Sequence, residues 1–449
     1  MSARIFNMLL GVWLTAAPAL LGYTGAARTN DSIVGPIVAS VALMAMWEVL
    51  RPLRWINFAF GLWLIAAPSI FDYEGSPLFN SLIVGALLSS FALVRGRRTK
   101  RFGGGWSSLW RHAIPSEDQD GRPEVVVVTG ASAGVGRAVV REFAKRKAKI
   151  GLLARGEDGL AGARKEVEAA GGKALVIPID VSDAEQVEAA AAAVEEAFGP
   201  IDIWVNNAMV SVLSPVKEMP PEEFKRVTDV TYLSYVYGTL AALRRMLPRD
   251  RGTIVQVGSA LAYRSIPLQS AYCGAKHAVK GFTDALRSEL IHDKSRVRIT
   301  MVQLPAHNTP QFSWIKTRMP NHPQPVPPIF QPEVAAEAIY WAAHHNRREL
   351  TVGWPAAKAI WGNKIIPGFL DWYLALKGYG GQQTGEPVDP NRPDNLWRPV
   401  PGDHGARGIF SHRAKPDSIH LRLNLHRGTV IAAGVIALML LATGIFIWY

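Results

Sequence analysis

Three side chains in the middle of the chain could together transfer a proton: Ser259, Tyr272 and Lys276. Tyr272 and Lys276 are four residues apart, so on a helix they share one face. The pKa of a free phenol is about 10, too high for a base at neutral pH, and a neighbouring ammonium group lowers it. Ser259 follows an expected strand, residues 253–257, and could hydrogen-bond a substrate oxygen. The three residues predict proton transfer at a carbonyl or an alcohol, with Tyr272 passing the proton.

A glycine-rich turn upstream could hold the phosphates of a dinucleotide. The all-apolar run 125–128 predicts a buried parallel strand, and the turn 129–137 follows it and opens a helix over 138–147. Glycine lets the backbone turn sharply and approach a pyrophosphate at the positive end of the helix. The residues of this turn that we assign to cofactor binding are Gly130, Ser132, Gly134, Val135 and Gly136.

The end of the second expected strand, residues 150–154, indicates which dinucleotide is preferred. Arg155 follows this strand. An acidic residue here would hydrogen-bond a ribose 2′-hydroxyl and favour NAD, whereas an arginine suits a 2′-phosphate. Arg155 therefore predicts NADP(H), and the alternative is a surface arginine that covers the end of the strand.

The following elements alternate strictly between helix and strand. The sequence patterns predict a helix over 157–170, a strand over 174–179, a helix over 183–197 and a strand over 203–206. Such alternation predicts an α/β fold, a Rossmann-like doubly wound parallel sheet.

Together these motifs resemble the classical short-chain dehydrogenase/reductases (SDR). The resemblance covers about residues 123–350, more than half of the chain. It is carried by Thr129-Gly130-x-x-x-Gly134-x-Gly136, Asp180-Val181, Asn206-Asn207-Ala208, Ser259 and Tyr272-x-x-x-Lys276.

The resemblance implies hydride transfer with a nicotinamide cofactor. It implies that Asp180 and Val181 hold the adenine ring, and that Asn206, followed by Ala208, supports the central strand beside the cofactor. Tyr272 and Lys276 would also contact the cofactor, since Lys276 holds the ribose. Thr309 is expected to contact the carboxamide or a phosphate.

Three positions depart from the family pattern. Thr231 stands where the family commonly has an asparagine that anchors a water leading from the lysine, and we include it in the catalytic set because it can still hydrogen-bond. Met209 replaces a glycine and narrows the expected nicotinamide pocket. Pro305-Ala306 replaces a common Pro-Gly pair.

The net charge of +12 is concentrated beside apolar segments. Residues 95–115 carry +6 and residues 404–428 carry +4, whereas residues 1–94 are neutral and residues 116–403 carry only +2. A nucleic-acid binder would concentrate basic residues on its folded module, so the sequence predicts no nucleic-acid partner. A single cysteine, Cys273, excludes an internal disulfide, and the histidines lack ligand spacing, so no metal site is predicted.

The first 95 residues predict a membrane module built from a repeat. Residues 7–18 recur as residues 57–68, and this repeat resembles the SPW repeat, a small bacterial membrane module. A spanning helix needs about 20 apolar residues. We expect two transmembrane hairpins, with helices over about 5–27, 32–50, 55–71 and 75–94, and a further transmembrane helix over 429–448.

Basic residues indicate the orientation of this module. Arg51 and Arg54 lie between the second and third expected spans, and six basic residues follow the fourth, so these segments and the catalytic domain should be cytoplasmic. The predicted location is the inner (plasma) membrane of a bacterium. The other expected divisions are a basic juxtamembrane linker at 96–121, the catalytic domain at 122–355, an interfacial or cleft-covering helix at 356–378 and a Pro/Gly-rich tether at 379–428.

The sequence thus predicts a membrane-anchored, NADP(H)-dependent oxidoreductase that interconverts a carbonyl and an alcohol, mainly by reduction. Anchorage at the bilayer suggests a lipophilic small-molecule substrate. The alternative is a catalytically weak NADP-binding membrane scaffold or redox sensor. The expected partners are the substrate and the lipid bilayer, and a homodimer stays open.

Overall fold

The structure is a computed structural model that describes residues 2–45, 52–94, 122–389 and 391–427. Contacts between residues divide the chain into two compact units, residues 1–112 and 113–449. The predicted juxtamembrane linker at 96–121 and the predicted transmembrane helix at 429–448 lie outside the described residues.

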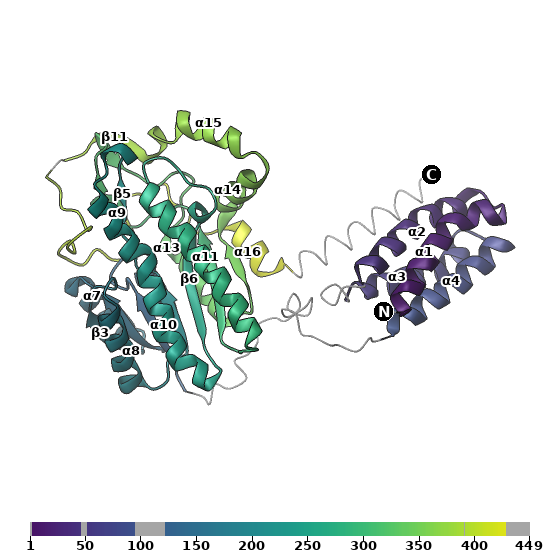
Figure 1. The fold of residues 1–449 in the computed structure, drawn as a ribbon, viewed down its shortest axis with the longest axis horizontal. Helices are drawn as coiled ribbons and strands as arrows, with labels where there is room; N and C mark the ends of the chain where they lie inside the picture. The colour runs from purple at the N-terminus through teal and green to yellow at the C-terminus, as the bar shows by residue number, and fades with distance from the viewer. Residues whose placement is uncertain (1, 46–51, 95–121, 390, 428–449) are drawn as a thin grey trace. The chain divides into compact units, whose positions relative to one another are not determined.

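The described part of the first unit consists of four helices (Figure 1). They are α1 (Ser2–Leu21), α2 (Gly25–Met44), α3 (Arg54–Ile70) and α4 (Ser76–Leu93). Within the described residues, the stretches 4–21 and 76–93 are long and apolar enough to cross a membrane. α3 has only 17 residues, the lower end of the usual length of a spanning helix.

The second helix begins earlier than the sequence predicts. The prediction started it at residue 32, after the last charged residue, whereas α2 begins at Gly25 and includes Arg28 and Asp31. Asp31 is tolerated inside the helix because its carboxylate accepts hydrogen bonds from Tyr23 and Asn80 in the interior of the unit. Asp31 therefore lies inside the helix and does not mark its beginning, because Tyr23 and Asn80 hydrogen-bond its carboxylate.

Glycines let the two helices of each repeat pack closely. A Cβ atom added to Gly11 would lie 2.7 Å from the carbonyl oxygen of Gly35, and one added to Gly61 would lie 2.9 Å from that of Gly85. Both distances are too short for a side chain. The same crossing therefore recurs in both repeats.

Reciprocal hydrogen bonds join the two repeats. Nε1 of Trp13 donates to Oδ1 of Asn80, and Nε1 of Trp63 donates to Oδ1 of Asn30, each at 2.8 Å. These residues occupy equivalent positions in the repeats. Each repeat thus supplies the acceptor for the indole N–H of the other, which explains why tryptophan and asparagine recur together.

The described residues of the second unit form a seven-stranded parallel sheet of order β10-β7-β6-β4-β1-β2-β3 (Figure 1). The predicted doubly wound parallel sheet is confirmed. The strands are β1 (Val125–Thr129), β2 (Lys149–Ala154), β3 (Lys173–Pro178), β4 (Ile203–Asn206), β6 (Thr253–Ser259), β7 (Arg298–Leu304) and β10 (Glu349–Thr351).

Helices cover both faces of the sheet, which buries β1 completely. Val126 and Val128 pack toward one face and Val125 and Val127 toward the other, because side chains alternate along a strand. The first face is covered by α6 (Gly134–Ala144), α7 (Glu157–Ala169) and α13 (Pro332–His344). The second is covered by α8 (Ala184–Phe198), α9 (Pro221–Thr228), α10 (Ser234–Met246) and α11 (Ser270–His292).

The segment predicted as one helix at 356–378 consists of two. α14 covers Gly353–Ile365 and α15 covers Pro367–Lys377. The break falls at Ile366, the residue before Pro367, where the proline ring disfavours the helical region.

The predicted tether at 379–428 is wrong, because its described part folds onto the catalytic unit. β11 (Gln383–Pro387) pairs antiparallel with β9 (Asn321–Pro323), and α16 (Ile419–Leu425) follows further along. Between them, residues 391–411 form an extended segment that we call the strap. Three of its apolar residues, Leu396, Ala406 and Phe410, are buried. These anchors fix the strap despite its linker-like content of proline and glycine.

Candidate active site

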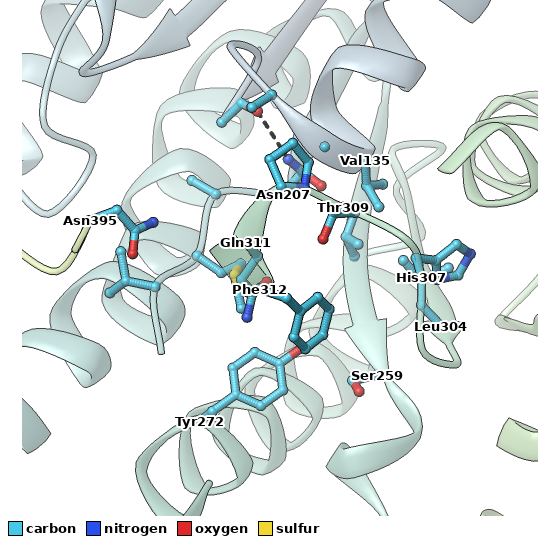
Figure 2. A pocket seen from close by; sticks show the side chains of 18 of the residues that line it. Val135, Asn207, Ser259, Tyr272, Leu304, His307, Thr309, Gln311, Phe312 and Asn395 are labelled. Carbon is cyan, nitrogen blue, oxygen red and sulfur yellow. Dashed lines mark hydrogen bonds between the residues drawn. The ribbon is translucent and has the colours of Figure 1, made fainter. Parts of the chain in front are cut away.

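A cavity of about 460 Å³ lies at the carboxyl ends of the central strands. In a parallel α/β sheet this edge is where ligands bind. The cavity is lined by the turn after β1, the ends of β2 and β6, the start of α11 and the strap. Figure 2 shows Tyr272, Ser259, Asn207, Thr309 and Asn395 around it.

Ser259 and Tyr272 meet inside this cavity. Ser259 is the last residue of β6, and Tyr272 lies in the first turn of α11. Both side chains line the cavity. Burial raises the pKa of the Tyr272 phenol, and the nearby Ser259 hydroxyl opposes that rise. Ser259 Oγ also accepts a 3.1 Å bond from the backbone N–H of Leu261, which fixes the hydroxyl.

Lys276 lies one helical turn after Tyr272 and is almost completely buried. Its Nζ donates to the hydroxyl of Tyr235 and to the carbonyl oxygen of Val257, each at 2.8 Å. Nζ lies 5.7 Å from the centre of the Tyr272 ring. An ammonium group has three donors, so one is left after these two bonds. Burial lowers the pKa of Lys276 to about 7.

Tyr235, which holds Lys276, was missed by the sequence analysis. It is fully buried on α10, and its hydroxyl also donates to Val257 at 3.1 Å. Burial raises the pKa of Tyr235 well above its usual value, so the hydroxyl stays protonated. The available signal was its place just after Thr231 in the same helical stretch.

Thr231, predicted to take part in the proton relay, does not reach Lys276. Its hydroxyl donates to the carbonyl oxygen of Val210 at 2.8 Å and accepts from the N–H of the same residue at 3.1 Å. Thr231 lies in a π-helical turn, residues Asp229–Leu233, between α9 and α10. Its side chain therefore fixes the segment after β4, and its predicted catalytic role is not supported by this geometry.

The glycine turn has the backbone that a diphosphate requires. Gly130 and Gly134 have φ angles of +67° and +59°, which side chains disfavour. A Cβ added to Gly136 would lie 2.1 Å from the carbonyl oxygen of Gly130, so this glycine lets α6 approach the turn.

Gly136 itself is behind the turn, whereas Ser132 and Val135 line the cavity. Ala133, the N-cap of α6, provides no side-chain cap, so the first-turn N–H groups other than that of Gly134, which donates to Gly405, remain for phosphate oxygens. The residues present therefore fit a nicotinamide dinucleotide.

Asn206 was predicted to bind the cofactor, but its side chain lies in the core below the cavity. Its Nδ2 donates to Gln256 and Thr239 at 2.9 and 3.1 Å. The next residues line the cavity instead: Asn207 donates to the carbonyl oxygen of Thr129, and Ala208 follows. Side chains alternate along a strand, so adjacent residues face opposite ways. Asn206 supports the central strand, which agrees with the narrower role that the family resemblance implied.

Asp180, Val181 and Thr309 lie in the lining, as expected for cofactor-binding residues. Asp180 accepts hydrogen bonds from Ser182 at 2.7 Å and from Arg226 at 2.5 Å. Burial raises the pKa of Asp180, but these hydrogen bonds outweigh it and hold the pKa below its usual value. The carboxylate is therefore ionised and fixed in place.

Arg155 lines the cavity, and its guanidinium group also binds the strap. Its terminal nitrogens donate to the carbonyl oxygens of Asn395 at 2.6 Å, Trp397 at 3.0 Å and Leu396 at 3.4 Å. None of these bonds uses Nε. Burial and the nearby Arg226 lower the pKa of Arg155. The predicted phosphate ligand is thus also the residue that fixes the strap beside the cofactor cavity.

A second arginine connects the strap to the glycine turn. Arg137 on α6 is buried and donates to Asp403 at 3.1 Å, to Glu166 at 2.7 Å and to the carbonyl oxygen of Ser132 at 3.1 Å. The N–H of Gly134 donates to Gly405 of the strap at 3.0 Å. The strap is therefore part of the wall of the cofactor site.

The cavity wall near Ser259 is largely apolar. α14 contacts the short helical turn that follows Ser259, residues Ala260–Ala262, and contributes Ala356 and Ala359 to the lining. The other apolar residues of the lining include Met209, Ile266, Phe312 and Val326. Such a wall suits an apolar substrate better than a charged one.

The chain is similar to known proteins in two regions. The short chain dehydrogenase family matches residues 124–318, and the SPW repeat domain matches residues 1–95. The uncharacterised oxidoreductase YxnA of Bacillus subtilis is 31% identical over 320 residues, which cover 70% of this chain and 88% of YxnA.

Two solved structures resemble 51% of the chain. One is a metagenomic short-chain oxidoreductase in complex with NADP, with 26% identity, a TM-score of 0.44 and 96% of its own chain covered. The other is a short chain dehydrogenase from Mycobacterium paratuberculosis bound to NAD, with 23% identity, a TM-score of 0.45 and 95% of its own chain covered. By its sequence matches, the chain belongs to the short-chain dehydrogenase/reductase family of oxidoreductases and carries an SPW repeat domain in its first 95 residues.

Proposed function

We propose that the chain is a membrane-anchored, NADP(H)-dependent reductase that interconverts a carbonyl and an alcohol on a lipophilic substrate. The observation that carries this proposal is that Ser259 and Tyr272 line one cavity, with Lys276 one turn after Tyr272 on the same helix. All three residues line the cavity that also contains the glycine turn.

In the proposed mechanism, Ser259 hydrogen-bonds the carbonyl oxygen and holds it beside the Tyr272 hydroxyl. A bound nicotinamide cofactor supplies the hydride for the carbonyl carbon. Tyr272 gives its proton to the carbonyl oxygen as negative charge develops there. The ammonium group of Lys276 stabilises the phenolate that remains. Tyr235 and Val257 orient Lys276, since they accept hydrogen bonds from two of its three N–H donors.

The preference for NADP(H) rests on Arg155. It is the cation at the end of β2, where a 2′-phosphate would lie, and its Nε takes no part in the hydrogen bonds to the strap. The other proposed cofactor contacts are Gly130, Ser132, Gly134, Val135, Asp180, Val181, Ala208, Thr309, Tyr272 and Lys276, all of which line the cavity.

Two observations support a lipophilic substrate and membrane anchorage. The cavity wall near Ser259 is apolar, with Phe312 and Ala356 among its residues. The SPW repeat domain contributes two stretches, 4–21 and 76–93, that could cross a membrane. An enzyme held at a bilayer has access to substrates dissolved in it.

NADPH consumption by the purified full chain, measured with a panel of ketones of graded lipophilicity, tests this proposal. We expect turnover to rise with lipophilicity, to prefer NADPH to NADH and to be lost in Tyr272→Phe. Turnover that persists unchanged in Tyr272→Phe would contradict the mechanism. Turnover restricted to small polar carbonyls would contradict the substrate class.

A further inference from the structure

The outer surface of α14 and α15 is strongly apolar and exposed. α15 buries none of its residues, all of which the structure describes. Trp361 is 62% exposed and Trp372 is 61% exposed. The exposed apolar residues that we call the platform are Trp361, Ile365, Phe369, Trp372, Tyr373 and Leu376. Exposed apolar residues of this number on two neighbouring helices mark an interaction surface.

The helix pair is held firmly in the position that exposes the platform. Arg264 donates to Asp371 at 2.5 Å and to Asn363 at 3.2 Å. Asn363 donates in turn to the carbonyl oxygen of Tyr263 at 2.7 Å. These bonds tie both helices to the turn that follows Ser259. The exposure of the platform is therefore fixed by the fold.

The charges around the platform are basic. Lys358, Lys364 and Lys377 lie on the two helices, and Asp371 is the only carboxylate between residues 353 and 377. Asp371 is paired with Arg264, so it does not oppose the lysines. Aromatic residues flanked by lysines match the chemistry of an anionic lipid surface.

The helix α16, which contacts α14, is followed in the sequence by another apolar segment. α16 packs against α14, with the rings of His420 and Trp354 4.8 Å apart, and ends at Leu425 (Figure 1). The uncharged run 429–448 begins four residues later. Four residues span at most about 14 Å, so a membrane that receives this run must lie close to α14.

We propose that α14 and α15 dock on an anionic lipid bilayer, with the platform in the interfacial layer and the lysines at the phosphate groups. The inner face of α14 lines the cavity through Ala356 and Ala359, so one helix connects the bilayer with the substrate site. In this respect the inference rests on the proposed function and deepens it, since the substrate then enters from the lipid.

A fluorescent label at the platform tests this docking. Cys273 is buried and is the only cysteine of the chain, so an introduced cysteine can be labelled selectively. Trp372→Cys of the full chain is labelled with a polarity-sensitive dye and reconstituted in vesicles of phosphatidylcholine and phosphatidylglycerol. Phe224→Cys on α9, an exposed aromatic position away from the platform, is the matched control.

We expect spin-labelled lipids to quench the dye at position 372 at least several-fold more than the dye at position 224. Quenching should fall when phosphatidylglycerol is omitted and in the double variant Lys358→Gln/Lys364→Gln. Equal quenching at both positions would overturn the proposal. Energy transfer between labels that rises with protein density, without quenching by lipids, would identify a second copy of the chain as the occupant and would also overturn it.

The experiment separates this inference from the proposed function because lipid quenching requires no turnover. Strong quenching at position 372 in a chain that reduces no ketone would support docking and contradict the reductase. In an active chain, the lysine double variant should raise KM for a ketone dissolved in the vesicles, and leave KM for a water-soluble ketone unchanged. An equal effect on both ketones would contradict entry from the lipid.

Discussion

Nζ of Lys276 lies 2.8 Å from the hydroxyl oxygen of Tyr235, to which it donates a hydrogen bond. Both groups also donate to the carbonyl oxygen of Val257, so the three atoms form a closed triangle behind the site. Tyr235 does not line the cavity that contains Ser259, Tyr272 and Lys276. It is therefore a positioning residue that acts through the lysine.

The activity of the free enzyme should depend on pH through the charge of Lys276. Burial lowers the pKa of Lys276 to about 7, so the ammonium form exists below this pH and is lost above it. Since the ammonium group stabilises the Tyr272 phenolate, kcat/KM for NADPH should fall as the pH rises through about 7. In Lys276→Arg the guanidinium stays charged, so the residual activity should show no decline in this range. A wild-type profile that is flat across neutral pH would contradict the role of the lysine.

Removal of the Tyr235 hydroxyl should shift this pH profile. Tyr235→Phe takes away an acceptor that favours the charged lysine, so the pKa of Lys276 should fall further and the decline should move to lower pH. A hydrogen bond to a charged group contributes about 1.5–3 kcal/mol, which corresponds to a loss of roughly tenfold or more in kcat at neutral pH. The matched control is Tyr237→Phe on the same helix. It should change neither kcat at neutral pH nor the pH at which activity declines. A purely structural role for Tyr235 would lower activity without moving the profile.

The close approach of α6 to the glycine turn leaves no room for a methyl group on Gly136. In Gly136→Ala the new Cβ would lie 2.1 Å from the carbonyl oxygen of Gly130, so the backbone of the turn must move. Overpacking of this kind costs about 1–3 kcal/mol, and the distorted turn should bind NADPH more weakly. Calorimetric titration and thermal unfolding measure the two effects. Gly281→Ala in α11, where a Cβ meets no neighbouring atom, should instead stabilise the fold by about 0.5–1 kcal/mol.

The strap should loosen when its acidic anchor is removed. Asp403→Asn weakens the charged hydrogen bonds from Arg137, so opening of the strap should become easier by about 1–2 kcal/mol. Hydrogen exchange at the amide of Gly405 should then be roughly tenfold faster, and KM for the cofactor should rise. Asp417→Asn removes an exposed ion pair with Arg422 and should leave hydrogen exchange at Gly405 and KM for the cofactor unchanged. Unaltered exchange in Asp403→Asn would show that the strap is held by other contacts.

The sheet and much of the site could be predicted from sequence because their signals are local. The apolar run at Val125–Val128 indicates a buried strand, and the glycines after it indicate a turn, without knowledge of the rest of the chain. The spacing of Tyr272 and Lys276 likewise needs only helical periodicity.

The strap could not be predicted because its contacts are distant in sequence. Asp403 meets Arg137 across 266 residues, and Asn395 meets Arg155 across 240. The buried residues of the strap stand among prolines and glycines without a helical or strand period, so the composition resembles that of a tether. Tyr235 was hidden for a different reason. The π-helical turn at Asp229–Leu233 adds a residue to the turn, so the face that Tyr235 presents departs from regular helical spacing.

Arg155 binds the strap and, in our proposal, the 2′-phosphate of NADPH, and these two roles affect NADPH and NADH differently. Binding of the strap stabilises the site for either dinucleotide, whereas contact with a 2′-phosphate benefits NADPH alone. Arg155→Ala should therefore weaken both cofactors through the strap, and should lower kcat/KM for NADPH by a further factor of about 10 to 100, the effect of one charged hydrogen bond. The ratio of kcat/KM for NADPH to that for NADH isolates the phosphate contact. Arg164→Ala, in the exposed ion pair with Glu168 on the neighbouring helix, should leave the ratio unchanged. If the ratio also stays constant in Arg155→Ala while both values fall, then Arg155 serves only the strap, and the preference for NADP(H) must have another source.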